Sequence, residues 1–277
     1  MTPPNDDPGR DRVVEAEIDV PGTPEEVWHA IATGPGITAW FVPTEVDERE
    51  GGTITQHHGP ELDIGGEITA WEPPHRFAYL SNPWQPTDDV APERIATEFL
   101  IEAQAGGTCV VRVVNSGFGS GAGWDQAIGS TRQGWPPALY TLRLYLTHFP
   151  GLAPASFAVG GTASGTREEA WNELLSSIGL PSPAEGERLA SGAGSPPLAG
   201  TVERLSDGQL LMRTDEPGPG LAYVGAGGPG YEVYTFVRGI FYGDSAPGIA
   251  TRAGAEWQAW MDEHFPAAQA AGAETDA

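Results

Sequence analysis

An alternating pattern of apolar and polar residues predicts a strand at the start of each half of the chain. In VVEAEIDV, residues 13–20, every second position from Val14 to Val20 is apolar, which is typical of a half-buried strand. Residues 155–161, ASFAVGG, carry a weaker version of this pattern. The two halves of the chain therefore begin alike.

A helix-start signal follows each of these strands, and its two copies form an internal repeat. GTPEEVW at residues 22–28 and GTREEAW at residues 165–171 are identical at five of seven positions, at an offset of 143. In each copy a threonine, Thr23 or Thr166, is followed three positions later by glutamate, the capping-box pattern of a helix N-terminus. The repeat predicts two units that share one plan.

A second repeated motif indicates where each unit ends. HFP occurs at residues 148–150 and again at 264–266, now at an offset of 116, so the later unit is 27 residues shorter between the same landmarks. We expect a first domain over 12–151, a second domain over 153–266, and disordered tails at 1–11 and 267–277.

Strand-like runs dominate the middle of the first unit. A short helix is expected first, in GPGITAWF at residues 34–41. The runs that follow are separated by turn signals at Glu50-Gly51-Gly52, Gly65-Gly66, Pro73-Pro74 and Gly106-Gly107. Short turns between consecutive strands favour an antiparallel meander. The expected strands are TEVDER, GTITQHH, GEITAW, RFAYLS, RIATEFLIEA and TCVVRVVNS.

A helix closes the first unit. Its apolar residues recur at spacings of 4, 3, 4 and 3, so they lie on one stripe that must cover something apolar, and the sheet is the candidate: Trp135, Leu139, Leu142, Leu146 and Phe149. Pro136 and Pro137 either begin this helix or kink a longer one that starts near Trp124.

The second unit repeats the plan with fewer parts. A helix over 166–178 is followed by a stretch rich in Pro, Gly, Ser and Ala over 179–200, where the first unit has its second helix and most of its early strands. The strands expected after it are TVERL, QLLMRT, GLAYVGA and YEVYTFVRGIFYG. A last helix near 250–265 places Trp257, Trp260, Met261 and His264 at helical spacing.

Composition excludes several classes of function. The chain has 38 acidic and 14 basic residues, a net charge of -24, which disfavours nucleic acid and anionic membranes as partners. All the basic residues are arginine, so phosphate-loop and Schiff-base chemistry, which need lysine, are excluded. A single cysteine, Cys109, excludes an intrachain disulfide. These features and the lack of a long apolar stretch predict a cytoplasmic protein without membrane insertion.

The order of these elements resembles the SRPBCC superfamily, the START-like helix-grip proteins. The first unit is similar to the branch named for homologues of the activator of the heat-shock-protein ATPase. The likeness is carried by EEVWHAIATGPGITAWFVP (25–43), GGEITAWEPPHRFAYL (65–80) and GWPPALYTLRLYL (134–146). It implies an α+β fold of two tandem helix-grip domains, each a curved antiparallel sheet wrapped around a C-terminal helix. The second domain, which lacks the Trp-Phe-x-Pro segment, is expected to be shorter and degenerate.

The resemblance also implies an apolar cavity between sheet and closing helix. Members of the superfamily bind lipids, sterols or aromatic polyketides, some are cyclases or aromatases, and some occur in enediyne and other antibiotic clusters of actinobacteria. We therefore expect a binding or carrier protein for a hydrophobic small molecule such as a polyketide, a polyene or a lipid-like intermediate, with no cofactor and no metal. Two alternatives stay open: a cyclase or aromatase that uses a cavity acid or base, and a self-resistance protein that sequesters a reactive antibiotic or is cleaved by it.

Large aromatic residues are the candidates for lining such a cavity, because Trp and Tyr suit a flat apolar ligand and orient it through their NH and OH groups. We expect no catalytic residue and no chaperone partner. The expected lining residues are Trp40, Phe41, Trp71, Tyr79, Trp84, Phe99, Trp135, Leu139, Leu142, Tyr234, Phe236, Trp257 and Met261.

Few polar side chains are candidates for metal binding or catalysis. His57, His58, Glu61 and Asp63 cluster in sequence, but adjacent strand residues point to opposite faces, so a polar hairpin is favoured over a metal site. His148 and His264 are expected to lie at helix ends, in structural roles. Proton shuttling by His57, Tyr79, Asp125 or Tyr234 remains an alternative without a spacing that supports it. The sequence leaves open the ligand's identity, whether the cavities are open, and the oligomeric state.

Overall fold

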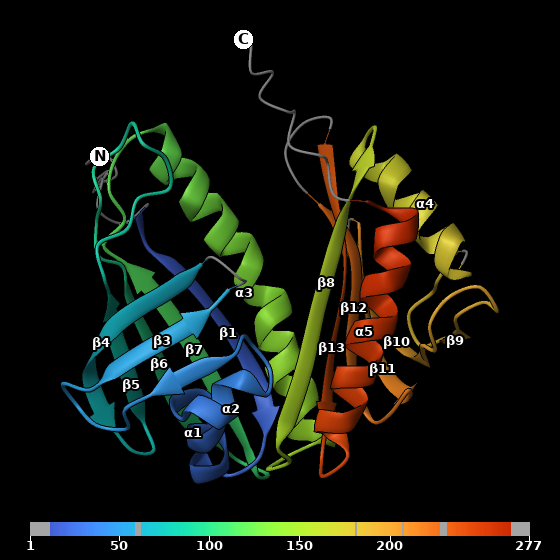
Figure 1. Ribbon diagram of the computed structural model, residues 1–277. Helices are drawn as coiled ribbons and strands as arrows, with labels where there is room; N and C mark the ends of the chain where they lie inside the picture. Colours follow the sequence, from blue (N-terminus) through green and yellow to red (C-terminus); the bar gives the residue numbers. More distant parts are fainter. Residues whose placement is uncertain (1–11, 59–61, 181, 207, 228–231, 267–277) are drawn as a thin grey trace, which may run out of the picture. The chain divides into compact units, whose positions relative to one another are not determined.

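The structure is a computed structural model that describes residues 12–58, 62–180, 182–206, 208–227 and 232–266. The chain divides into two compact units, and the boundary lies between Leu152 and Ala153. Each unit is an antiparallel sheet with helices (Figure 1).

The N-terminal unit contains a seven-stranded antiparallel sheet in the order β1-β7-β6-β5-β4-β3-β2. Strands β2 to β7 form the predicted meander. Strand β1 pairs with β7 and is one edge strand of the sheet. The strands are β1 (Val14–Pro21), β2 (Thr44–Val46), β3 (Thr53–His57), β4 (Asp63–Glu72), β5 (Arg76–Ser81), β6 (Ala96–Gln104) and β7 (Thr108–Ser116).

Three helices belong to this sheet: α1 (Pro24–Ala32), α2 (Gly34–Thr38) and α3 (Ala122–His148). The closing helix α3 is the longer of the two predicted alternatives, because Pro136 and Pro137 lie inside it. The stripe from Trp135 to Phe149 is buried as predicted, and α3 packs along β1. The space between α3 and the sheet is where any internal site must form.

The C-terminal unit has six strands in the order β8-β13-β12-β11-β10-β9. The core cluster joins α4 and α5 to one face of the sheet. Its elements are β8 (Pro154–Ser164), α4 (Arg167–Ile178), β9 (Arg188–Ala190), β10 (Ala199–Ser206), β11 (Gln209–Glu216), β12 (Gly220–Gly227), β13 (Glu232–Tyr242) and α5 (Ala246–His264).

The two units have the same topology. In each one, the first strand pairs with the last strand, the intervening strands follow in reverse order, and the C-terminal helix packs on the first strand. This arrangement confirms the predicted α+β class and the tandem helix-grip plan. The C-terminal unit is the reduced copy, but the expectation that it lacks most of the early strands is wrong: it has one strand fewer than its counterpart.

Both predicted capping boxes are present. The side chain of Thr23 accepts a hydrogen bond from the Glu26 amide while Glu26 accepts one from the Thr23 amide, and Thr166 and Glu169 repeat the arrangement. Each box satisfies two backbone N–H groups that the first helical turn leaves without partners. The repeat therefore marks equivalent positions at the starts of α1 and α4.

One predicted turn is wrong. Gly65 and Gly66 lie inside β4, not between strands. A Cβ atom on Gly66 would lie 2.8 Å from the carbonyl oxygen of Leu80, and one on Gly65 would lie 2.8 Å from Nδ2 of Asn82. These glycines allow a close approach between neighbouring segments, a role that sequence alone does not distinguish from a turn.

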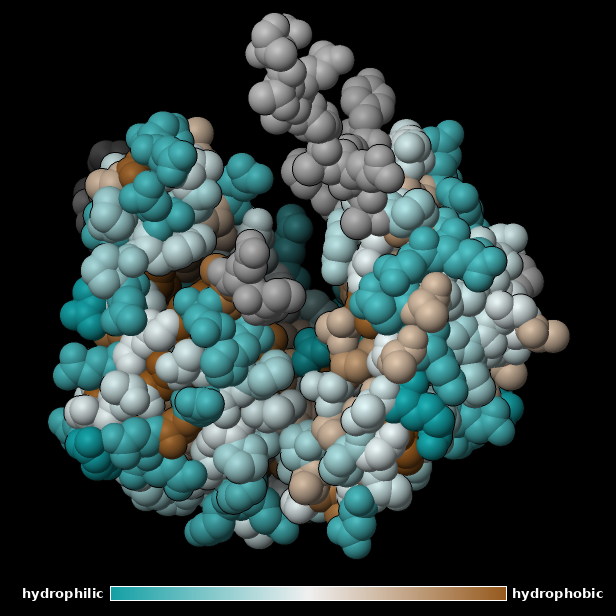
Figure 2. Space-filling model, viewed as in Figure 1, coloured by the Kyte–Doolittle hydropathy of each residue, from teal (hydrophilic) through white to brown (hydrophobic). Residues whose placement is uncertain are grey.

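Hydrophilic side chains cover much of the face seen in Figure 2, with hydrophobic side chains visible between them. In the part of the chain that the structure describes, no helix combines the length and the apolar character needed to cross a membrane.

Candidate functional site

A cavity of about 290 Å³ lies in the N-terminal unit, bounded by the sheet and α3. Inward-facing residues of strands β3 to β7 form one side of it, and the middle of α3 forms the other. Connecting segments complete the wall. The lining residues are Phe41, Gln56, His58, Ile64, Tyr79, Ser81, Trp84, Ile95, Thr97, Asn115, Phe118, Thr131, Gly134 and Trp135.

Aromatic rings form part of the cavity wall. The ring of Phe41 is stacked on Trp135, with centroids 5.7 Å apart and planes 18° apart. Phe99 meets Trp135 edge-on at 5.7 Å from behind the wall, and His58 meets Phe41 edge-on at 5.8 Å. Such offset and edge-to-face contacts hold each ring in one orientation. Phe41 and Trp135 are therefore aromatic rings of fixed orientation in the cavity lining.

A row of polar side chains crosses the sheet and meets this wall at Trp135; we call Gln56, Tyr79, Thr97 and Asn115 the polar row. Tyr79 is opposite Thr97 in the β5–β6 pair, and Thr97 is opposite Asn115 in the β6–β7 pair. Their side chains thus lie side by side on one face of three adjacent strands. All four are buried, with exposed fractions of 4–7%.

Hydrogen bonds connect the polar row to the closing helix. Asn115 Nδ2 donates to Thr97 Oγ1 at 2.8 Å, and Trp135 Nε1 donates to Asn115 Oδ1. At the other end of the row, the Tyr79 hydroxyl donates to Gln56 Oε1 at 3.4 Å. Buried polar groups persist in an apolar interior when they are paired in this way. The row is therefore a fixed set of donors and acceptors at the cavity surface.

Burial determines the ionisation of Tyr79. Removal from water raises the pKa of its phenol, and hydrogen bonds with Thr97 and Gln56 offset this only in part. The hydroxyl is consequently neutral near pH 7. Its one proton is already donated to Gln56, so towards a ligand it is a hydrogen-bond acceptor, and it is poorly suited to act as a base.

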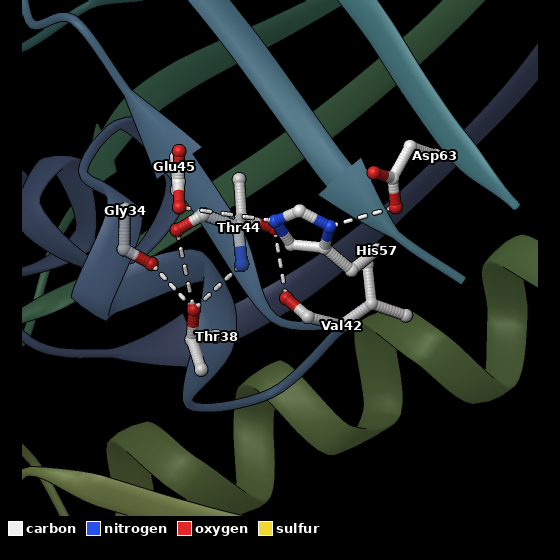
Figure 3. Close-up of polar contacts among 7 residues, drawn as sticks. All are labelled: Gly34, Thr38, Val42, Thr44, Glu45, His57 and Asp63. Carbon is white, nitrogen blue, oxygen red and sulfur yellow. Dashed lines mark hydrogen bonds and ion pairs between the residues drawn. The ribbon is translucent and has the colours of Figure 1, made fainter. Parts of the chain in front are cut away.

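The β3–β4 hairpin forms one edge of the cavity. A pair of polar side chains joins its two strands. His57 lies opposite Asp63, and its Nδ1 is 2.7 Å from Oδ1 of Asp63 (Figure 3). Its Nε2 is 4.0 Å from Oε1 of Glu45 on β2. His58, the next residue, lines the cavity, so the two histidines serve different sides of the sheet.

A second set of contacts in Figure 3 positions Phe41. The hydroxyl of Thr38, at the end of α2, donates to the carbonyl of Gly34 and accepts from the amide of Thr44 at 2.9 Å. The hydroxyl of Thr44 donates in turn to the carbonyl of Val42 at 2.8 Å. These bonds close the turn between α2 and β2, and Phe41 lies within that turn.

The structure brings four of the predicted lining residues to the cavity: Phe41, Tyr79, Trp84 and Trp135. Five others pack in the N-terminal unit without lining it: Trp40, Trp71, Phe99, Leu139 and Leu142. Trp40 shows why, because its Nε1 donates to the carbonyl of Ala30 at 2.9 Å and its ring lies against Phe99. These contacts hold the indole of Trp40 against α1, away from the cavity lining.

The four predicted residues of the C-terminal unit have two different environments. Trp257 and Met261 belong to that unit's hydrophobic core, with exposed fractions of 1% and 0%. Tyr234 is 52% exposed and is stacked on Phe236, on the opposite face of β13 from the buried residues Val233 and Val237. These four residues do not share one site.

Of the polar row, only Tyr79 was predicted from the sequence to line the cavity. A signal was present, because Gln56, Thr97 and Asn115 occupy positions whose parity along the strand matches buried apolar residues such as Ile54, Phe99 and Val113. A polar residue at an inward position must find a partner or face a cavity. Phe118 also lines the cavity, and it lies in the glycine-rich connection between β7 and α3, where no helix or strand periodicity indicates which side chains face inward.

The remaining polar candidates lie outside the cavity. Asp125 pairs with Arg12 at 3.0 Å, and His264 Nδ1 lies 2.9 Å from the carbonyl oxygen of Trp260 near the end of α5. Glu61, the other member of the predicted polar hairpin, lies outside the described residues. In the described ranges, no three His, Cys, Asp or Glu side chains are grouped as metal ligands.

A known protein family matches most of the N-terminal unit. Residues 21–147 match the family described as Activator of Hsp90 ATPase homolog 1-like protein. The match confirms the resemblance expected for this unit, and its range holds every lining residue of the cavity, from Phe41 to Trp135. Among curated proteins, no sequence matches the chain.

Several solved structures are similar to the chain at low identity. Protein MLL2253 from Mesorhizobium loti is 23% identical over 49% of this chain and 97% of its own, with a TM-score of 0.45. The di-domain ARO/CYC BexL, from the BE-7585A biosynthetic pathway, is 15% identical over 91% of this chain and 93% of its own, at 0.46. DynU16, from the dynemicin biosynthetic locus, is 14% identical over 90% and 97%, at 0.43.

Proposed function

We propose that the N-terminal unit binds a small, planar, hydrophobic molecule of the aromatic polyketide kind in the cavity beneath α3, and that the protein carries or sequesters it. The observation that carries this proposal is the combination of the aromatic wall, Phe41 on Trp135, with the buried polar row that meets it. Ligand pockets typically have this character, mostly apolar with a few fixed polar groups that set orientation.

The size of the cavity favours a compact ligand. About 290 Å³ is near the lower end of the range for small-molecule sites, which is roughly 300–1,000 Å³. A fused ring system with a few oxygen substituents suits such a volume better than a long lipid chain does. The amide nitrogen of Gln56 would then donate to a ketone oxygen of the ligand, and the neutral hydroxyl of Tyr79 would accept from a phenol hydroxyl.

Binding is better supported than acid–base catalysis. Among the described residues that line the cavity, the ionisable side chains are His58 and Tyr79, and burial disfavours ionisation of Tyr79. General acid–base catalysis needs a group whose pKa is close to the working pH and that lies within hydrogen-bond reach of the substrate. The Tyr79 hydroxyl, which stays neutral near pH 7, does not meet the first condition.

Gly134 offers a direct test. It lines the cavity, and a Cβ atom placed on it meets nothing within 4 Å, so Gly134→Leu would add a side chain at the cavity lining at a position with room for its Cβ. Gly129 lies on the same helix, is equally unobstructed and is outside the lining. Gly129→Leu is therefore a matched control, and both changes favour the helix, because leucine is a better helix former than glycine.

The experiment is a titration of the wild type and both variants with 1,8-dihydroxyanthraquinone, followed by tryptophan fluorescence. We expect saturable quenching in the wild type and in Gly129→Leu, and a loss of affinity of about tenfold or more in Gly134→Leu, since the leucine takes the ligand's space. Equal affinity in the two variants, or no saturable response in any protein across a panel of aromatic polyketides, contradicts the proposal.

A further inference from the structure

A second hollow, of about 330 Å³, adjoins the cavity in the N-terminal unit. It lies between the N-terminal half of α3 and the segment of residues 82–95 that connects β5 to β6. Its polar side chains come from both sides, Thr87 from the segment and Gln126, Ser130 and Thr131 from α3. We call it the outer groove.

The outer groove and the cavity share part of their walls. Trp84 and Thr131 line both, so the two hollows are neighbours on either side of these residues. Trp84 is 37% exposed, which places an apolar ring at the boundary between the interior and the surface. A ligand that fills the cavity and extends past Trp84 would enter the outer groove.

The segment that carries Trp84 is held firmly against α3. The backbones of Trp84 and Glu93 exchange two hydrogen bonds, at 2.9 and 2.8 Å, and Trp124 Nε1 donates to the carbonyl of Ala91 at 3.1 Å. A Cβ atom on Gly123 would collide with the hydroxyl of Thr87, so the segment and the helix approach as closely as glycine permits. The outer groove is thus bounded by two fixed walls.

The chemistry of the groove differs from that of the cavity. Its polar side chains are hydroxyls and a carboxamide, which donate and accept hydrogen bonds without charge. The hydroxyl of Thr131 already donates to the carbonyl of Ala127 at 2.9 Å, so its lone pairs are free to accept. Asp88 and Asp89 follow Thr87 in the chain, and the whole chain carries a net charge of -24, which disfavours an anionic group at this place.

From this geometry we infer that the outer groove is a second ligand subsite, which binds a neutral polyhydroxylated substituent, such as a sugar, attached to the aromatic skeleton in the cavity. The inference rests on the proposed function, because it assigns the outer part of the same ligand. Gln126 and Ser130 bind the substituent's hydroxyls, and the ring of Trp84 packs against the linkage between the two parts.

The test compares two probes that differ only by the sugar: 1,8-dihydroxyanthraquinone and its mono-O-β-D-glucoside. The variant is Gln126→Ala combined with Ser130→Ala, two truncations of exposed helical residues. Gln133→Ala, an exposed glutamine of the same helix outside both hollows, is the matched control. Affinities are measured by isothermal titration calorimetry.

The expected result is that the double variant binds the glucoside about tenfold more weakly, since two hydrogen bonds are lost, and binds the aglycone as the wild type does. The control variant should bind both probes normally. An unchanged glucoside affinity in the double variant, or a wild type that binds the aglycone and rejects the glucoside, overturns the inference and leaves the proposed function standing. Failure of both probes to bind any protein overturns the proposed function and this inference with it.

Discussion

The indole N–H of Trp135 donates a hydrogen bond to the side-chain oxygen of Asn115, and this bond joins the closing helix to the sheet inside the cavity. Asn115 also donates to Thr97, so its amide occupies the middle of a chain that runs from α3 to β6. One short side chain thus supports both the helix packing and the polar row.

Replacing Asn115 by alanine should destabilise the N-terminal unit by about 2–4 kcal/mol, because two buried polar groups, on Trp135 and Thr97, would lose their partner. Urea unfolding followed by tryptophan fluorescence measures the effect. Thr97→Val is the graded comparison: it removes one hydroxyl and leaves the Trp135 bond intact, so it should cost only about 1 kcal/mol. An Asn115→Ala protein as stable as Thr97→Val would show that the bond to Trp135 contributes nothing.

Tyr79 predicts a pH dependence with a definite sign. Its pKa is raised in the folded protein, so the neutral phenol is favoured there and the unfolded chain ionises first, near the ordinary value of about 10. The stability that depends on the neutral form is therefore complete below about pH 10 and is lost as the pH rises above it.

At pH 8 we expect Tyr79→Phe to be less stable than the wild type by about 1 kcal/mol, because the variant lacks the hydrogen bond to Gln56. The deficit should shrink above about pH 10, because phenylalanine cannot ionise in either state. Urea unfolding at several pH values measures the difference in unfolding free energy between the two proteins. Burial also raises the pKa of Tyr145, but both proteins contain this residue, so its contribution cancels in the difference. A deficit that stays constant with pH contradicts the prediction.

Cys109 should report on the opening of the N-terminal sheet. It lies on β7 opposite Val20 of β1 and is fully buried. Burial raises the pKa of its thiol, and the nearby charges of Glu25 and Glu26 raise it further, so the reactive thiolate is scarce in the folded state at pH 8. We expect a disulfide reagent to label the native protein far more slowly than the urea-unfolded chain. Equal labelling rates would mean that the β1–β7 pair opens readily in the native state.

The fold could be predicted from sequence largely because its signals are local. Thr23 with Glu26 and Thr166 with Glu169 mark helix starts through contacts within one turn, and the alternation from Val14 to Val20 marks a half-buried strand. Removing either capping threonine by Thr23→Ala or Thr166→Ala should therefore cost about 1 kcal/mol of stability, in the unit that carries it.

The site could be predicted only in part, because it depends on contacts between distant segments. Aromatic composition indicated Trp84 and Trp135, which lie at the cavity, yet it could not separate them from Trp257, whose ring fills a core. The polar row depends on the register of three strands, which places Tyr79, Thr97 and Asn115 side by side. Register is set by pairing along the whole sheet, so no short stretch of sequence reveals it.

The two neighbouring histidines provide a last test of which face of the sheet binds the ligand. His58 lines the cavity beside Phe41, whereas His57 is bound to Asp63 and faces Glu45. Replacing His58 by alanine should weaken binding of 1,8-dihydroxyanthraquinone several-fold, because the edge contact that holds Phe41 is lost, at about 0.5–1.5 kcal/mol. His57→Ala is the matched control, since it removes an exposed pair worth about 0–1 kcal/mol of stability and touches no cavity wall. If His57→Ala weakens binding as much as His58→Ala does, the ligand does not occupy the cavity side of this hairpin.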